Sequence, residues 1–187
     1  MSVLVVYASK RGATKGIAER LAETLTAAGQ DAEARPVQAA GGLAGHEAFV
    51  VGSAVYMRHW MEEACEFVRR NRTLLADRPV WLFSSGPLGG EATDAQGRDL
   101  AVVAEPTEIA EFREAIAPRE HRVFFGALDA GKLGISQRLL RKLPAARALL
   151  PDGDFRDWAE VEAWAGAIAR ETTQLAADQR SNGGEGS

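Results

Sequence analysis

Near its N-terminus the chain reads Val3-Leu4-Val5-Val6-Tyr7-Ala8-Ser9-Lys10-Arg11-Gly12-Ala13-Thr14. The first six of these residues form an unbroken apolar run, which is typical of a strand buried on both faces of a parallel sheet. Behind the loop, apolar residues recur at helical spacing at Ile17, Leu21 and Leu25 until Gly29 ends the pattern. This segment therefore predicts a strand, a glycine-containing loop and a helix, which together form the first unit of an α/β fold.

The alternation of strand and helix continues along the chain. Further buried strands are predicted at Phe49–Val51, Val80–Phe83 and Val123–Leu128, and a more exposed strand is predicted at Ala32–Val37. Further helices are predicted at Trp60–Leu75, Thr107–Ile116 and Trp158–Leu175. This order predicts an α/β fold with a doubly wound, five-stranded parallel sheet and helices on both faces.

Two segments do not follow this alternation. The segment 129–155 is too long for an ordinary connection between a strand and a helix, so we expect it to be an insertion within a single domain of residues 1–176. The chain ends in the polar, glycine-rich segment Ser181–Ser187. We expect residues 177–187 to form a disordered C-terminal tail because such a segment has little to bury.

Composition and charge exclude several classes of protein. The 187 residues are 46% hydrophobic, as in an ordinary globular domain, and the net charge of −4 disfavours binding to nucleic acid. The single cysteine, Cys65, excludes an intramolecular disulfide and a cysteine-ligated metal cluster. No apolar run approaches the roughly 20 residues of a membrane span, and the N-terminus lacks a basic leader, so we expect a cytoplasmic protein.

The loop Ser9–Thr14 has the features of a phosphate site. Its glycine permits a tight turn, its hydroxyls and successive N–H groups are donors, and a helix N-terminus follows. The alternative is an ordinary strand-to-helix turn capped by a hydroxyl. The loop contains neither the Gly-Lys-Ser/Thr of a nucleoside triphosphate site nor the Gly-x-Gly-x-x-Gly of a dinucleotide site, and it has no cysteine nucleophile.

Two more loops follow predicted strands at the same edge of the sheet. Gly52–Trp60 carries two aromatic residues, a methionine and a histidine, and Ser84–Gly90 is rich in serine, glycine and proline. Ligands of such sheets bind outside the carboxyl ends of the strands. An aromatic wall and free backbone groups beside a phosphate site suit a flat heterocycle with a phosphate tail.

With these motifs the chain resembles the flavodoxin family, whose phosphate loop reads Ser/Thr-x-Thr-Gly-x-Thr. The loop Ser9–Thr14 matches that pattern except that Arg11 replaces the middle threonine. The resemblance implies FMN as the cofactor, with its phosphate on Ser9, Lys10, Arg11, Gly12, Ala13 and Thr14. It also implies that the isoalloxazine ring lies between two sets of residues: Ser53, Ala54, Val55, Tyr56 and Trp60, and Ser84, Ser85, Gly86, Pro87, Leu88 and Gly89. Tyr56 and Trp60 are the candidates for stacking on the ring.

The resemblance is closest to the branch that contains the menaquinone-dependent protoporphyrinogen oxidase. The shared features are the spacing from Gly52 to His59, the sequence Gly126-Ala127-Leu128, a basic insertion, and Asp157-Trp158 before the last helix. The insertion departs from that branch because it is rich in Ala and Leu and poor in aromatic residues. Three functions remain open: an electron carrier for redox partner proteins, a flavin-dependent oxidoreductase acting on a quinone, a porphyrinogen or another small molecule, and a module without FMN.

Two further features have alternative interpretations. His59 is the candidate catalytic residue, for proton transfer or for an anionic substrate, and the alternative is a solvated loop histidine. Residues 132–150 place an apolar stripe opposite basic side chains, which suits either peripheral contact with a membrane or packing on the domain. For the remaining residues, we expect a surface position for His46 and His121 and a buried position for Cys65, Trp81 and Trp164.

Overall fold

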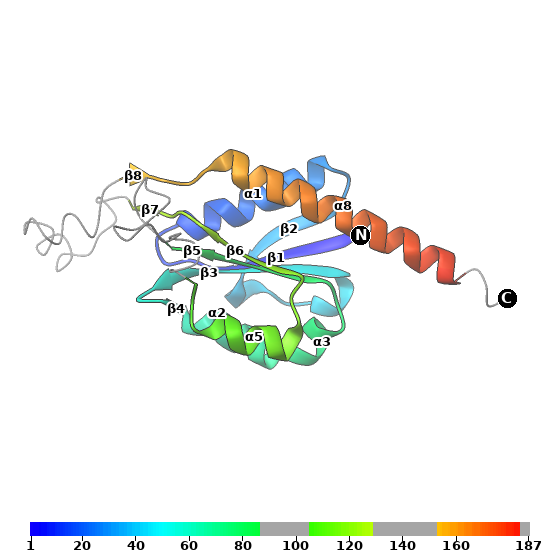
Figure 1. The fold of residues 1–187 in the computed structure, drawn as a ribbon, viewed down its shortest axis with the longest axis horizontal. Helices are drawn as coiled ribbons and strands as arrows, with labels where there is room; N and C mark the ends of the chain where they lie inside the picture. The colour runs from blue at the N-terminus through cyan, green and yellow to red at the C-terminus, as the bar shows by residue number, and fades with distance from the viewer. Residues whose placement is uncertain (87–104, 129–152, 184–187) are drawn as a thin grey trace, which may run out of the picture.

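The computed structural model describes residues 1–86, 105–128 and 153–183, and its centre is a parallel sheet (Figure 1). The parallel strands run in the order β2-β1-β3-β5-β6. Their bounds are β1 (Ser2–Ala8), β2 (Asp31–Pro36), β3 (Ala48–Tyr56), β5 (Val80–Ser85) and β6 (Glu120–Phe124). A sixth, short strand, β4 (His59–Trp60), pairs antiparallel with the end of β3. The predicted α/β fold with five parallel strands is confirmed, with β4 as an addition.

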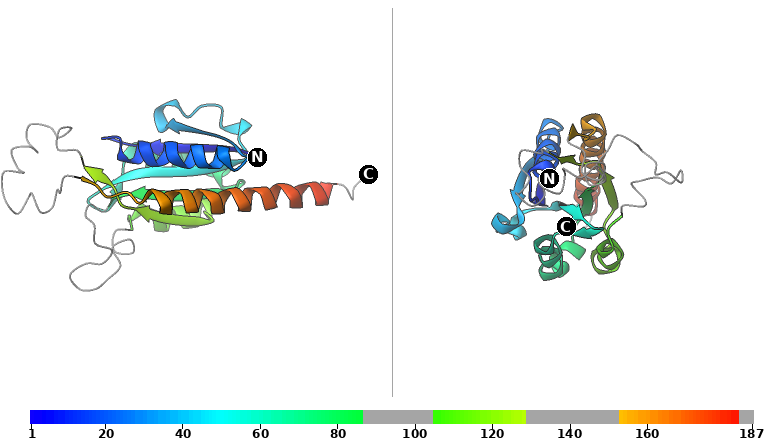
Figure 2. Two further views of the ribbon diagram at one scale, coloured as in Figure 1. Left: turned by 90° about the horizontal axis from the view of Figure 1, so that it is seen from above. Right: turned by 90° about the vertical axis from the view of Figure 1, so that its left-hand side faces the viewer.

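Helices cover both faces of the sheet (Figures 1 and 2). On one face lie α1 (Ala13–Ala27) and α8 (Trp158–Gly183), and on the other lie α2 (Glu62–Arg70), α3 (Arg72–Ala76) and α5 (Glu108–Ile116). Two single 3-10 turns, Val37–Ala39 and Leu43–Gly45, connect β2 to β3. No helix in the described parts of the chain has the length and hydrophobicity that crossing a membrane requires.

The apolar run of β1 explains this layering. β1 pairs with β2 on one side and β3 on the other, and alternate side chains point to opposite faces. Val3 and Val5 pack with α1 and α8, whereas Leu4 and Val6 pack in the core beneath α2 and α5. A central strand with both faces covered has no polar face, so the sequence shows no alternation.

The core contains the predicted tryptophans. Phe83, Phe124 and Trp164 form an aromatic cluster beneath α8, with centroid separations from 5.5 Å for Phe124 and Trp164 to 6.4 Å for Phe83 and Trp164. Trp81 is buried in the same core. Cys65 is buried on the opposite face, and all three expected burials are confirmed.

Three predicted elements differ from the structure. The predicted helix Trp60–Leu75 is instead β4, α2 and α3, because Trp60 pairs with Val55 in a hairpin and the Asn71 side chain binds the Phe67 carbonyl at the end of α2. The predicted strand Val123–Leu128 divides into β6 and β7 (Ala127–Leu128), and β7 pairs with β8 (Gly153–Asp154). Finally, α8 continues to Gly183, so residues 177–183 are helical where a tail was expected, since Ala177, Gln179 and Arg180 are helix-compatible residues.

Candidate functional site

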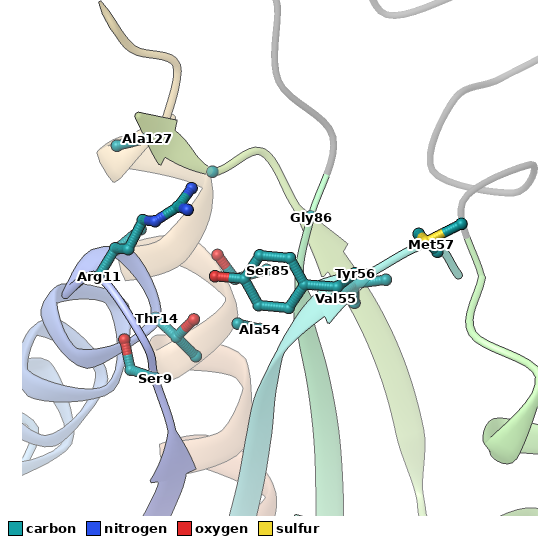
Figure 3. A pocket seen from close by; sticks show the side chains of 12 residues that line it. Ser9, Arg11, Thr14, Ala54, Val55, Tyr56, Met57, Ser85, Gly86 and Ala127 are labelled. Carbon is teal, nitrogen blue, oxygen red and sulfur yellow. The ribbon is translucent and has the colours of Figure 1, made fainter. Parts of the chain in front are cut away.

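A cavity of about 290 Å³ opens at the carboxyl ends of β1, β3 and β5 (Figure 3). It is lined by Ser9, Arg11, Ala13, Thr14, Ala54, Val55, Tyr56, Met57, Ser85, Gly86, Gly126 and Ala127. Residues from all three predicted loops therefore meet in one place, as the topology of a parallel sheet requires. The predicted residues Pro87, Leu88 and Gly89 lie outside the described residues.

The loop after β1 supplies one wall of the cavity. Gly12 has φ +91°, a left-handed conformation in which a glycine is not strained, and its carbonyl accepts the first helical hydrogen bond of α1 from Gly16 N at 3.0 Å. The Ser9 hydroxyl accepts a hydrogen bond from Gly12 N at 3.1 Å. Glycine at position 12 thus turns the chain directly from the strand into the helix, and the N-terminus of α1 faces the cavity.

Thr14 carries the clearest sign of a ligand-binding site. Its residue is 1% exposed, and its Oγ1 finds no hydrogen-bond partner among the described residues. Thr14 lines the cavity, and its hydroxyl points into it (Figure 3). A buried polar atom without a partner is costly, so such atoms in proteins are usually satisfied. A ligand that accepts hydrogen bonds at the N-terminus of α1 would remove this cost.

Tyr56 faces this loop across the cavity (Figure 3). The Lys10 ammonium is 5.9 Å from the centroid of the ring, and Arg11, in the loop that precedes α1, lines the same cavity. Burial raises the pKa of the Tyr56 phenol, and the positive charge of Arg11 offsets only part of that shift. The phenol is therefore neutral at physiological pH and presents a half-exposed aromatic face beside two cations.

The hairpin that carries Tyr56 has an unusual turn. Met57 and Arg58 join β3 to β4, and both have positive φ, at 50° and 66°. Two-residue hairpin turns of this kind favour Asn-Gly because most side chains disfavour the left-handed region. Met57 is 94% exposed and points away from Tyr56 at the cavity rim.

Trp60 and two predicted serines lie beneath the cavity rather than in it. Trp60, a predicted stacking residue, is 4% exposed, packs on Phe112 at a centroid separation of 5.4 Å, and is not among the residues that line the cavity. Its Nε1 donates to Ser84 Oγ at 2.7 Å. Ser53 is fully buried, where its Oγ accepts a hydrogen bond from Met61 N at 2.9 Å. Successive side chains of a strand point to opposite sides. In β4, His59 is exposed, so the next residue, Trp60, points inward.

Two of the three histidines differ from their expected positions. The His59 Nδ1 lies 2.7 Å from Glu108 Oε1 and 3.0 Å from Thr107 Oγ1, and His59 does not line the cavity. His121 was expected at the surface, but its side chain is 2% exposed between Ser84 Oγ, at 2.8 Å, and Glu105 Oε1, at 3.2 Å. His46 was expected there too, but its side chain is largely buried and bonds Ser2 Oγ. Polar partners from distant elements cover both buried rings.

Three cavity residues were not predicted: Met57, Gly126 and Ala127. Gly126-Ala127-Leu128 was noticed as a sequence motif but not assigned to the site. In the structure Ala127 belongs to β7, which pairs with β8, and Phe155 N donates to Gly126 O at 3.1 Å. Gly126 and Ala127 reach the cavity in a segment that pairs with β8, which follows the long insertion. Such a pairing between residues distant in sequence cannot be predicted from a local pattern.

Arg156 connects this small sheet to the loop after β1. Its guanidinium forms an ion pair with Asp154 at 2.6 Å, stacks on Trp158 at 4.4 Å, and donates to Ala13 O at 3.3 Å. A Cβ at Gly16 would lie only 2.6 Å from Arg156 Nη1. The missing side chain at Gly16 thus makes room for Arg156 across the first turn of α1.

Comparisons with known proteins agree with this architecture. The sequence profile of a family described as "Flavodoxin domain" matches residues 4–146. An archaeal flavodoxin structure is 18% identical, with a TM-score of 0.56 over 92% of this chain and 99% of that one. Oxidised flavodoxin 2 from Bacillus cereus is also 18% identical, with a TM-score of 0.58 over 91% of this chain and 99% of that one.

A larger protein shares the fold over part of its length. Rubredoxin oxygen:oxidoreductase from Desulfovibrio gigas is 16% identical, with a TM-score of 0.58 over 94% of this chain and 37% of that one. At these identities the structures establish the fold alone. No protein of curated function matches the sequence.

Proposed function

The chain belongs to the flavodoxin family, and from that premise we propose that it binds FMN and acts as a redox protein. The observation that carries the proposal is the unpartnered hydroxyl of Thr14, buried at the N-terminus of α1 and aimed into the cavity. This is the place where a phosphate gains most from N–H groups and helix potential. The residues present therefore fit a phosphorylated flavin.

In this proposal the loop Ser9–Thr14 binds the phosphate of FMN. Thr14 Oγ1 would donate to it, together with the N–H groups of the first turn of α1, which have no partner within the helix. Arg11 lines the cavity and adds a positive charge at the position where the family pattern has a hydroxyl. The cation takes over the role of a donor there, so the substitution is compatible with binding a phosphate.

The other two loops hold the flavin ring. Tyr56 offers an aromatic face, and backbone groups of Ala54, Ser85 and Gly86 lie at the ends of β3 and β5. When bound, FMN supplies the redox chemistry, accepting and donating electrons, while the protein supplies orientation and electrostatics. The neutral Tyr56 phenol and the cations Lys10 and Arg11 are the groups through which this chain would influence the potential of the flavin.

Binding of FMN is tested by titrating the apo protein with FMN and with riboflavin, which has the same ring but no phosphate. The proposal predicts that the purified protein absorbs in the visible flavin bands and that FMN binds at least about tenfold more tightly than riboflavin, because charged hydrogen bonds to the phosphate are lost in riboflavin. A colourless protein that gains no thermal stability from FMN would support the alternative of a module without the cofactor.

For the finer function we propose an oxidoreductase that acts on a small molecule, with a quinone or a porphyrinogen as the candidate substrates. The supporting observation is that Ala127 of β7, just before the segment 129–152, lines the cavity, and that β8, just after this segment, pairs with β7. The predicted membrane contact of residues 132–150 lies outside the described residues and stays a prediction. A cytoplasmic location likewise stays a prediction. An electron carrier for a redox partner protein is the alternative. Turnover of protoporphyrinogen with menaquinone, compared with reduction of a partner protein, distinguishes the two.

A further inference from the structure

The Met57–Arg58 turn is held in an unfavourable conformation by contacts from outside the hairpin. Both residues are left-handed although neither is glycine or asparagine. Residues persist in such conformations only where their surroundings impose them, and these positions cluster at functional sites. Within the hairpin itself, β3 and β4 pair through only two residue pairs, Val55 with Trp60 and Tyr56 with His59.

The surrounding contacts come from the start of α5. Thr107 N donates to Arg58 O at 3.1 Å, which fixes one side of the turn. The Glu108 carboxylate accepts from Trp60 N through Oε2 at 3.2 Å and lies 2.7 Å from His59 Nδ1 through Oε1. One carboxylate therefore contacts both residues of β4, and its side chain is only 14% exposed.

Glu108 is well suited to this task. It is the first residue of α5, where a negative charge is favoured by the helix dipole. Burial tends to raise the pKa of its carboxyl, but hydrogen bonds from His59, from its own backbone and from Trp60 N lower the pKa below its ordinary value. The group is thus a carboxylate at neutral pH and accepts hydrogen bonds only.

We propose that Glu108 is a positioning residue for the site: its carboxylate, with Thr107, keeps the Met57–Arg58 turn left-handed and thereby keeps the Tyr56 ring over the cavity. The link from Glu108 to the turn is argued from the hydrogen bonds described above. The link from Tyr56 to a flavin rests on the proposed function. In this account His59 positions the turn by contacting Glu108, instead of acting on a substrate.

The chain provides a matched control one turn further along α5. Glu111 is also a hydrogen-bonded carboxylate, although its side chain is more exposed, at 47%, and its described hydrogen bonds come from Arg69, at 2.7 and 2.8 Å, and not from the hairpin. Glu108→Ala and Glu111→Ala each remove one carboxylate from the same helix. Only the first removes the contacts to β4.

The first experiment measures amide hydrogen exchange of residues 56–60 in the apo protein. Loss of a charged hydrogen bond predicts that Glu108→Ala speeds exchange of Trp60 N and its neighbours by about tenfold or more, while Glu111→Ala leaves them unchanged. If Glu108→Ala does not fold, Glu108→Gln replaces it: the amide still accepts from Trp60 N, so exchange rises by a smaller factor. Unchanged exchange in either Glu108 variant, or an equal rise in Glu111→Ala, overturns the proposal.

The second experiment tests whether the contacts act by imposing the left-handed turn. Met57→Asn combined with Arg58→Gly installs the residues that favour this turn. In that background the Trp60 amide still loses its acceptor, but Glu108→Ala is expected to change exchange of the Tyr56 and His59 amides, which flank the turn, by about twofold at most, because the turn no longer depends on Glu108. An undiminished effect of Glu108→Ala on these two amides in the doubly substituted turn contradicts the proposed role.

The third experiment connects the turn to the cofactor. Glu108→Ala is expected to weaken FMN and riboflavin binding by the same factor, since Tyr56 would contact the ring and not the phosphate. If the wild-type protein binds neither flavin, the proposed function fails, and the exchange experiments still decide the role of Glu108. If the wild-type protein binds FMN and Glu108→Ala binds it equally well, the step from Glu108 to Tyr56 fails and the proposed function stands.

Discussion

Trp60 Nε1 donates a hydrogen bond to Ser84 Oγ at 2.7 Å, and Ser84 Oγ in turn lies 2.8 Å from His121 Nε2. Since the indole can only donate, the Ser84 hydroxyl is free to donate to His121, whose Nδ1 then donates to Glu105. This buried chain of hydrogen bonds joins β4, β5 and β6 beneath the floor of the cavity. We therefore expect Trp60 to stabilise the ends of the strands and not to contact the flavin.

Trp60→Phe is therefore expected to reduce stability without affecting the flavin. The change keeps most of the packing on Phe112 but removes the donor to Ser84, and a lost buried hydrogen bond lowers the free energy of unfolding by about 1–3 kcal/mol. Denaturant unfolding measures this loss, and FMN titration measures the affinity, which should not change. A large loss of FMN affinity with intact stability would restore Trp60 to the site.

Gly52→Ala should destabilise the sheet strongly. A Cβ at position 52 would lie 2.0 Å from the Phe83 ring on the neighbouring strand, so the ring or the strands must move. Overpacking of this kind costs about 1–3 kcal/mol, and sometimes more. Gly45→Ala is the matched control, because a Cβ there meets nothing within 4 Å, and thermal unfolding should separate the two variants clearly. Equal melting temperatures would contradict the close approach.

The buried His121 should make stability depend on pH. Burial lowers the pKa of its ring below the ordinary 6.5, and the neighbouring Glu105 opposes that shift only in part. The folded state then binds fewer protons than the unfolded state, so the free energy of unfolding falls as the pH drops from about 7 toward about 5. His121→Gln should remove this slope in denaturant titrations across that range. The same slope in both proteins would mean that another group is responsible.

Cys65 should be inert toward thiol reagents in the folded protein. Burial, together with the nearby charge of Glu108, raises the pKa of its thiol to about 11, and the residue is 4% exposed. Little thiolate exists at neutral pH, and the reagent cannot reach it. Alkylation followed by mass spectrometry should show modification only after unfolding in denaturant. Rapid modification of the native protein would contradict the burial of this helix face.

The sequence predicted the parts of the fold and of the site that depend on local patterns. The unbroken apolar run Val3–Ala8 indicated a central strand, and Gly12 indicated the turn that leads into α1. The helix was predicted to begin at Trp60 because this apolar residue continues the helical spacing of α2 toward the N-terminus. In the structure Trp60 pairs with Val55 in the β3–β4 hairpin instead. The burial of His121 and the contribution of Ala127 depend on partners distant in sequence, so no periodicity could reveal them.

The most direct test of the central claim is the effect of Thr14→Val on flavin affinity. Valine has the shape of threonine without the hydroxyl, so the apo protein should be equally or more stable, because a buried unpaired hydroxyl is removed. Thr172→Val is the control, since its buried hydroxyl already donates to Ile168 O at 3.0 Å. Thr14→Val is expected to weaken FMN binding by about tenfold or more and to leave riboflavin binding unchanged. Unchanged FMN affinity, or an equal loss for both flavins, would contradict the assignment of the phosphate to this loop.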